Sequence, residues 1–155
     1  MGPPVFRYVG ASLVLILAIT SPNHAASSLQ FYSLTPCRIV DTRGPNGPTG
    51  GPALQQGPIR GFPITTYCGV PSTAKAAMLK ITVVGPTAEG FVTVWQYNTP
   101  FPGVSNVNFV AGPSAMANGA CVPLAGGAFD VSATYGGVDP TATTHLLIDV
   151  AGYFQ

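Results

Sequence analysis

The stretch AAMLKITVV, residues 76–84, alternates its side chains at every second position and decides the fold class. One set of alternate positions is purely apolar, comprising Ala77, Leu79, Ile81 and Val83, and the other set includes Met78, Lys80 and Thr82. A period of two predicts a β-strand with one buried face. After the turn GPTAEG comes FVTVWQY, residues 91–97, and we expect these two strands to pair as a hairpin.

Short runs of the same kind continue along the rest of the chain. Glycine and proline, 19 and 16 of the 155 residues, separate these runs. The expected strands cover residues 29–40, 59–65, 105–110, 116–124, 128–135 and 143–154, with a long loop at residues 44–58 and a bulge or kink at Gly119. Six to nine short strands predict an all-β fold, an antiparallel β-sandwich or jelly-roll-like fold, in which the first and last strands pair.

The N-terminus has the layout of a secretory signal peptide. Arg7 precedes the apolar run VGASLVLILAI at residues 9–19, and a breaker and small residues follow up to Ala26. This run is shorter than the roughly 20 residues that span a bilayer, and an uncleaved anchor is the alternative. We expect residues 1–26 to be a signal peptide and residues 29–155 to form one secreted or cell-surface domain, with no membrane segment after cleavage.

Charged residues are scarce, since six basic and five acidic residues make up 7% of the chain. Without Arg7, which lies in the leader, five basic and five acidic residues remain, so the formal net charge is zero. Nucleic-acid binding needs a basic surplus, and nucleic acid is therefore excluded as a partner. A neutral surface has no electrostatic protection against association, which favours self-association.

Three cysteines, Cys37, Cys68 and Cys121, allow one disulfide in three ways. We favour Cys37–Cys68, because this bridge closes the Gly/Pro-rich loop and stabilises the fold by roughly 3–4 kcal/mol if loop entropy dominates. Cys121 lies in the apolar run ACVPL and is expected to be buried as a small hydrophobe. The cysteines and histidines fit no zinc spacing, and we expect no metal and no other cofactor.

Polar residues from the first and last strands form one candidate site. Asp41 and Arg43 share a face of the first strand, and His145 and Asp149 share a face of the last strand. If these strands pair, the four side chains meet, and we interpret them as an arginine–carboxylate lock with a satisfied histidine. The alternative is the site of a small hydrolase. The carboxylates available to such a site are those of Asp41, Glu89, Asp130, Asp139 and Asp149.

The end of the 91–97 strand is a second candidate site. Trp95, Tyr97 and Phe101 lie close together in the sequence, beside the amide of Asn98. Aromatic rings next to hydrogen-bonding amides suit stacking on sugar rings, so this surface predicts binding to a polysaccharide or the cell wall. The alternative is that Trp95 packs in the core or at a strand edge.

Six motifs follow one another between residues 31 and 155. They read PCRIVDTR (36–43), CGVP (68–71), ITVVGPTAEGFV (81–92), SNVNF (105–109), ANGACVPL (117–124) and THLLIDVAGYF (144–154). In this order the chain resembles an all-β domain that recurs in secreted and cell-surface bacterial proteins. The resemblance implies a module without an established activity, in which Cys37 and Cys68 pair. Cys121 departs from it, because that position is usually aliphatic.

These features predict a non-catalytic extracellular module, structural or adhesive, of a bacterial secreted or cell-surface protein. The first alternative is a carbohydrate-binding module that uses an aromatic surface centred on Trp95. The second alternative is a small hydrolase.

Overall fold

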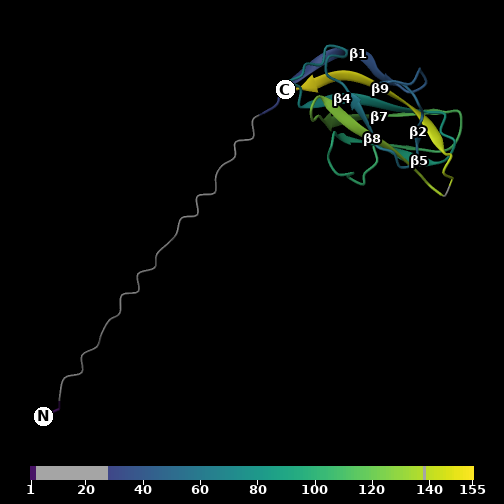
Figure 1. Ribbon diagram of the computed structural model, residues 1–155. Coiled ribbons are helices and arrows are strands. Elements are labelled where there is room, and N and C mark those ends of the chain that lie inside the picture. The colour runs from purple at the N-terminus through teal and green to yellow at the C-terminus, as the bar shows by residue number, and fades with distance from the viewer. Residues whose placement is uncertain (3–27, 138) are drawn as a thin grey trace.

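A computed structural model describes residues 1–2, 28–137 and 139–155 (Figure 1). Within these residues, nine strands form two antiparallel sheets packed as a β-sandwich, which confirms the predicted fold class. The strands are β1 (Phe31–Asp41), β2 (Leu54–Gln55), β3 (Arg60–Pro63), β4 (Ala76–Val84), β5 (Gly90–Gln96), β6 (Val107–Phe109), β7 (Ala115–Pro123), β8 (Ala128–Tyr135) and β9 (Thr143–Phe154). The predicted signal peptide lies outside the described residues, apart from residues 1–2.

The larger sheet has the strand order β1-β9-β4-β7, with β2 also pairing β9, and the smaller sheet has the order β3-β8-β5-β6. The last strand, β9, therefore lies inside the larger sheet, with β1 on one side and β4 on the other. The predicted pairing of the first and last strands is confirmed. Figure 1 shows the consequence, since the C-terminus of the chain lies beside the start of β1.

The core fills the space between the two sheets. The inward positions predicted for β4 are confirmed, because Ala77, Leu79, Ile81 and Val83 are all at most 1% exposed. They pack against inward residues of the smaller sheet that include Val92, Val94, Val107, Phe129 and Val131. Burial of these aliphatic and aromatic side chains supplies the main driving force for folding.

The predicted hairpin of residues 76–97 is wrong. β4 pairs with β7 and β9, whereas β5 pairs with β6 and β8 in the other sheet. The turn between them crosses from one sheet to the other, and its backbone bonds distant segments: Gly85 donates to the Ser114 carbonyl and Thr87 to the Thr143 carbonyl. Alternation predicts which face of a strand is buried but does not identify its partners.

Two expectations about β7 also differ from the structure. Its register with β4 is continuous from Ala115 to Pro123, so Gly119 makes no bulge. Cys121 is exposed rather than buried. The reason is that β7 is an edge strand in which Val122 faces the core, so the adjacent Cys121 faces outward, opposite Met78.

Each open side of the sandwich carries a cross-link. The disulfide between Cys37 and Cys68 joins β1 to the loop after β3, with the two Cα atoms 5.9 Å apart, and the predicted pairing is confirmed. On the β6–β7 side, the Asn118 amide donates to the Asn106 carbonyl at 2.9 Å. Asn106 also lengthens the smaller sheet. Its backbone N–H donates to the Val92 carbonyl, and its side-chain oxygen accepts from the Val94 N–H at 2.7 Å.

We expect Asn106→Ala to lower the free energy of unfolding by about 1–3 kcal/mol, because it leaves the N–H of the buried Val94 without its acceptor. Asn108→Ala is the matched control: Asn108 is exposed on the neighbouring strand, and its loss should cost at most about 0.5 kcal/mol. Urea unfolding of the two variants measures the difference. Equal stability of both would contradict the role assigned to Asn106.

Candidate functional site

Four charged side chains alternate in sign along the outer face of the larger sheet. Arg43 contacts Asp41 through two hydrogen bonds, with Nε–Oδ1 and Nη2–Oδ2 distances of 2.9 and 2.7 Å. Arg38 contacts Asp149 in the same forked manner, at 2.7 and 3.1 Å. Arg38 Nη1 also lies 3.8 Å from Asp41 Oδ2. We call Arg43, Asp41, Arg38 and Asp149 the charge ladder.

Sequence reasoning missed Arg38, although it joins the two halves of the charge ladder. In a regular strand, residues 38 and 41 point to opposite faces, because they are three positions apart. The pairing of β1 with β9 shifts between Arg38 and Val40, however, and this irregularity brings Arg38 to the same face as Asp41. Asp149 lies directly opposite Arg38 in the register. The one available signal was that arginines flank Asp41 on both sides.

The predicted cluster required His145 to lie beside the carboxylates, but it does not. Its Nδ1 atom lies 3.1 Å from the Thr42 carbonyl and 3.3 Å from the Thr42 hydroxyl. Thr42 also exchanges hydrogen bonds with the backbone of Leu146. His145 therefore helps to fasten the chain just beyond β1 to β9, and no carboxylate is placed to polarise its imidazole.

The Gly/Pro-rich loop folds beside the charge ladder. It forms a surface pocket of about 410 Å³ that is lined by residues 44, 45 and 47–50, by Arg38 and Asp41, and by Ile39. Arg60 holds the loop from behind, because its guanidinium donates to the carbonyls of Gly50, Gly51 and Pro52. A side chain at Gly50 would collide with the Pro45 carbonyl, so glycine is required at this close approach.

The ion pairs change the acidity of Asp41. Its hydrogen bonds from Arg43 hold the pKa of this carboxyl group at about 2, well below its usual range. A carboxylate in this state is a poor proton acceptor at neutral pH, because general-base catalysis works best with a pKa near the operating pH. The Asp41–Arg43 pair is local, because these residues are two positions apart, and the contact of the charge ladder that joins β1 to β9 is Arg38 with Asp149.

The aromatic candidates do come together, but Trp95 is covered. Phe91, Thr93 and Trp95 alternate with the core residues Val92 and Val94, so they face away from the core. The segment 98–105 folds over this outer face. Thr93 donates to the Val104 carbonyl, and Trp95 Nε1 donates to the Thr99 carbonyl at 3.0 Å. Trp95 is consequently only 6% exposed, which removes it as the centre of a binding surface.

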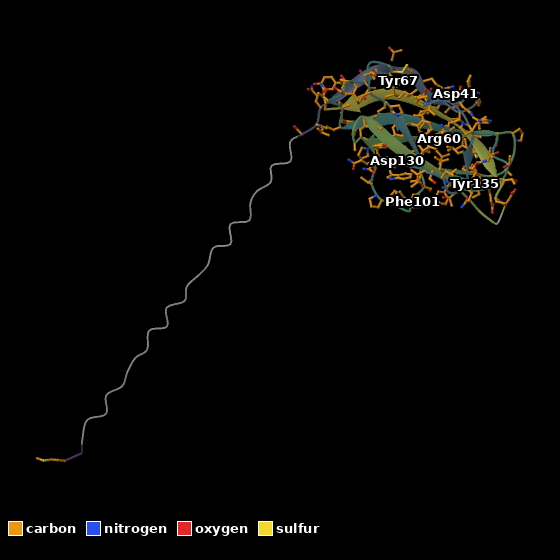
Figure 2. All side chains as sticks on the ribbon, viewed as in Figure 1. Asp41, Arg60, Tyr67, Phe101, Asp130 and Tyr135 are labelled. Atoms are coloured by element: carbon orange, nitrogen blue, oxygen red, sulfur yellow. A yellow bond between two sulfur atoms is a disulfide. The ribbon has the colours of Figure 1, made fainter. Side chains whose placement is uncertain are left out.

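Tyr97 and Phe101 are the aromatic residues of this set that remain accessible, at 42% and 45% exposure. Phe101 packs edge-on against Trp95, with ring centroids 5.4 Å apart. Asn98 adopts a left-handed backbone conformation, and its N–H donates to Asp130. Figure 2 shows Phe101 at the lower side of the folded domain and Asp41 at its upper side, in keeping with their places on the smaller and the larger sheet.

The other acidic residues are spread over the molecule. Asp139 accepts two hydrogen bonds from Thr141 within its own turn. Glu89 makes no side-chain hydrogen bond or ion pair within the described part of the chain. Among these same residues, no three His, Cys, Asp or Glu side chains gather as metal ligands would. No helix in residues 28–137 or 139–155 has the length and apolarity to cross a membrane.

Comparison with known proteins adds no assignment. No protein-family model matches the chain, and no curated protein sequence shows significant similarity to it.

We expect Asp41→Asn to change the acid stability of the fold. Because the folded pKa of Asp41 is about 2, its carboxylate stabilises the protein above the unfolded pKa of about 3.9, and this contribution is lost as the pH falls from there towards 2. The variant should lose about 0.5–1 kcal/mol at pH 7, as partly exposed ion pairs do, and should show a flatter decline below pH 4.

Urea unfolding at pH 7, 4 and 2.5 measures this difference. Glu89→Gln is the control, because it removes an acidic side chain that has no partner in the described residues. Parallel stability curves for the wild type and Asp41→Asn would contradict a stabilising role for the charge ladder.

Proposed function

We propose that this protein is a non-catalytic structural or adhesive module of a bacterial secreted or cell-surface protein. The observation that carries the proposal is the charge ladder. In a domain with so few charges, Arg38, Arg43, Asp41 and Asp149 pair with one another, and the Arg38–Asp149 contact crosses from β1 to β9. Side chains with the chemistry of a hydrolytic site thus serve to hold two strands together.

The carboxylates also speak against the hydrolase alternative. Two-carboxylate hydrolysis needs a free acid and a free base about 5–10 Å apart. Asp41 and Asp149 are held by arginines, Asp130 accepts the Asn98 N–H, and Asp139 accepts from Thr141. Glu89 is the remaining carboxylate, and among the described residues no second free carboxylate is available to act with it.

Export is supported by two features. A disulfide persists in oxidising compartments, outside the cytosol, and the Cys37–Cys68 bridge lies at the edge of the sandwich. The first 26 residues have the composition of a secretory leader. A cross-linked, nearly uncharged sandwich suits a durable extracellular surface.

Carbohydrate binding is the second candidate function, and its site would be formed by Tyr97 and Phe101 instead of centring on Trp95. Tyr97 and Phe101, which follow the buried Trp95 in the sequence, are exposed, and their rings offer apolar faces. Stacking of such rings on sugars would give the adhesive function a polysaccharide partner.

Incubation of the protein with insoluble polysaccharides and bacterial cell-wall material tests the proposal. The retained protein and the released soluble fragments are measured in the same samples. We expect saturable retention on at least one polymer without release of fragments. Release that grows with time, and that is lost in Asp149→Asn, would contradict the non-catalytic assignment.

A paired variant distinguishes the two candidates for the adhesive surface. If sugars stack on the aromatic loop, Tyr97→Ala combined with Phe101→Ala should reduce retention at least tenfold, because tenfold is about 1.4 kcal/mol and the variant removes the apolar contact area of two rings. Tyr67→Ala is the matched control, because Tyr67 is equally exposed, at 40%, in the loop after β3. Unchanged retention in the double variant would assign adhesion to another surface.

A further inference from the structure

A surface pocket of about 310 Å³ lies at the end of the smaller sheet, away from both sites described above. It forms where β5 begins and β8 ends, and it is lined by Glu89, Phe91, Phe109, Thr134, Tyr135 and the glycines 90 and 136. In Figure 2 the label of Tyr135 lies at the lower right, apart from Phe101. Its volume is at the lower end of the range for small-molecule sites, and suits one sugar ring.

The walls of this pocket are aromatic. Phe109 and Tyr135 pack edge to face, with centroids 5.7 Å apart at an interplanar angle of 64°. The Tyr135 hydroxyl points away and donates to the Leu54 carbonyl, and both rings belong to the core, since Phe109 is 4% and Tyr135 is 6% exposed. Phe91, which is half-buried, lies opposite Thr134 in the register and places an apolar ring beside a hydroxyl group.

Two glycines allow the chain to pack closely at this pocket. A side chain at Gly90 would collide with the Thr134 carbonyl and the Phe109 ring, and a side chain at Gly136 would press against the Glu89 carboxylate. The Gly136 N–H donates to the Glu89 carbonyl and fixes the backbone at the rim. This hydrogen bond therefore fixes the backbone of Glu89 at the rim of the pocket.

The charge at this pocket is uncompensated. Glu89 is the one acidic residue whose side chain has no partner among the described residues, and none of the residues that line the pocket is basic. A carboxylate beside aromatic rings favours a cation, because the ammonium group gains a charge-assisted hydrogen bond and a cation–π contact. A lysine side chain is too thin to fill the volume, whereas a sugar ring also offers an apolar face to Phe91 and hydroxyls to Thr134.

We propose that this pocket binds an amino sugar of the glucosamine type, with its ammonium group on Glu89 and its ring against Phe91. The inference does not depend on the proposed function, because either a structural or an adhesive module can carry such a site.

Titration of the ¹⁵N-labelled protein with glucosamine at pH 6, followed by NMR, tests this inference. At that pH the amine of glucosamine is protonated. We expect saturable shifts of the Gly90 and Gly136 amides with a dissociation constant of about 1–10 mM, as expected for one charge-assisted contact plus one ring. Glu89→Gln should weaken binding at least fivefold.

Three comparisons make the test specific. Asp139→Asn removes one acidic charge from the neighbouring turn and should leave binding within twofold of the wild type. N-acetylglucosamine, which lacks the ammonium group, and lysine amide, which lacks the ring, should each bind at least fivefold more weakly than glucosamine. Absent shifts, equal binding by Glu89→Gln, or equal binding of either comparison ligand would overturn the proposal.

Discussion

The larger sheet depends on the position of β9 between β1 and β4. This strand is the last one in the sequence, yet it makes hydrogen bonds to both neighbouring strands over most of its length. Its inward residues Leu146, Ile148 and Val150 are fully buried, so the core of the larger sheet closes only when the C-terminus is in place. The charge ladder, the His145–Thr42 contact and the pocket beside the Gly/Pro-rich loop all lie along its junction with β1. Removal of the last strand would therefore disrupt the sheet and the candidate site together.

The scarcity of charge explains how the remaining polar groups are used. One ion pair and one amide hydrogen bond join different strands: Arg38 with Asp149 across β1 and β9, and Asn118 with Asn106 across the two sheets. The other two ion pairs, of Asp41 with Arg43 and with Arg38, are local. The disulfide performs the same task on the opposite side. The polar contacts of the domain are mostly structural, and we propose the accessible aromatic surface and the Glu89 pocket as the surfaces for recognition.

Alternation in the sequence was enough to predict the strands other than β2, which lies in the expected loop, and the inward face of β4, because burial of one face imposes a period of two. The pairing of the first and last strands was expected from the sandwich fold class. It was not enough to predict partners, since residues 85–89 carry the chain from one sheet to the other. The register shift next to Arg38 changes the face of the sheet to which a side chain points, and the residue types there do not reveal it. Likewise, nothing in the letters of residues 98–105 shows that they fold over Trp95; that is a property of the tertiary structure.

A double-mutant cycle on Arg38 and Asp149 tests the central claim, that the charge ladder holds β1 to β9, most directly. Urea unfolding of Arg38→Ala, Asp149→Ala and the double variant gives the coupling free energy. We expect both single variants to be less stable than the wild type. The coupling free energy should be about 1 kcal/mol, near the upper end of the range for ion pairs at the protein surface, because this pair is forked and partly buried. A coupling near zero, or a single variant more stable than the wild type, would contradict the claim and indicate that these residues are retained for chemistry instead.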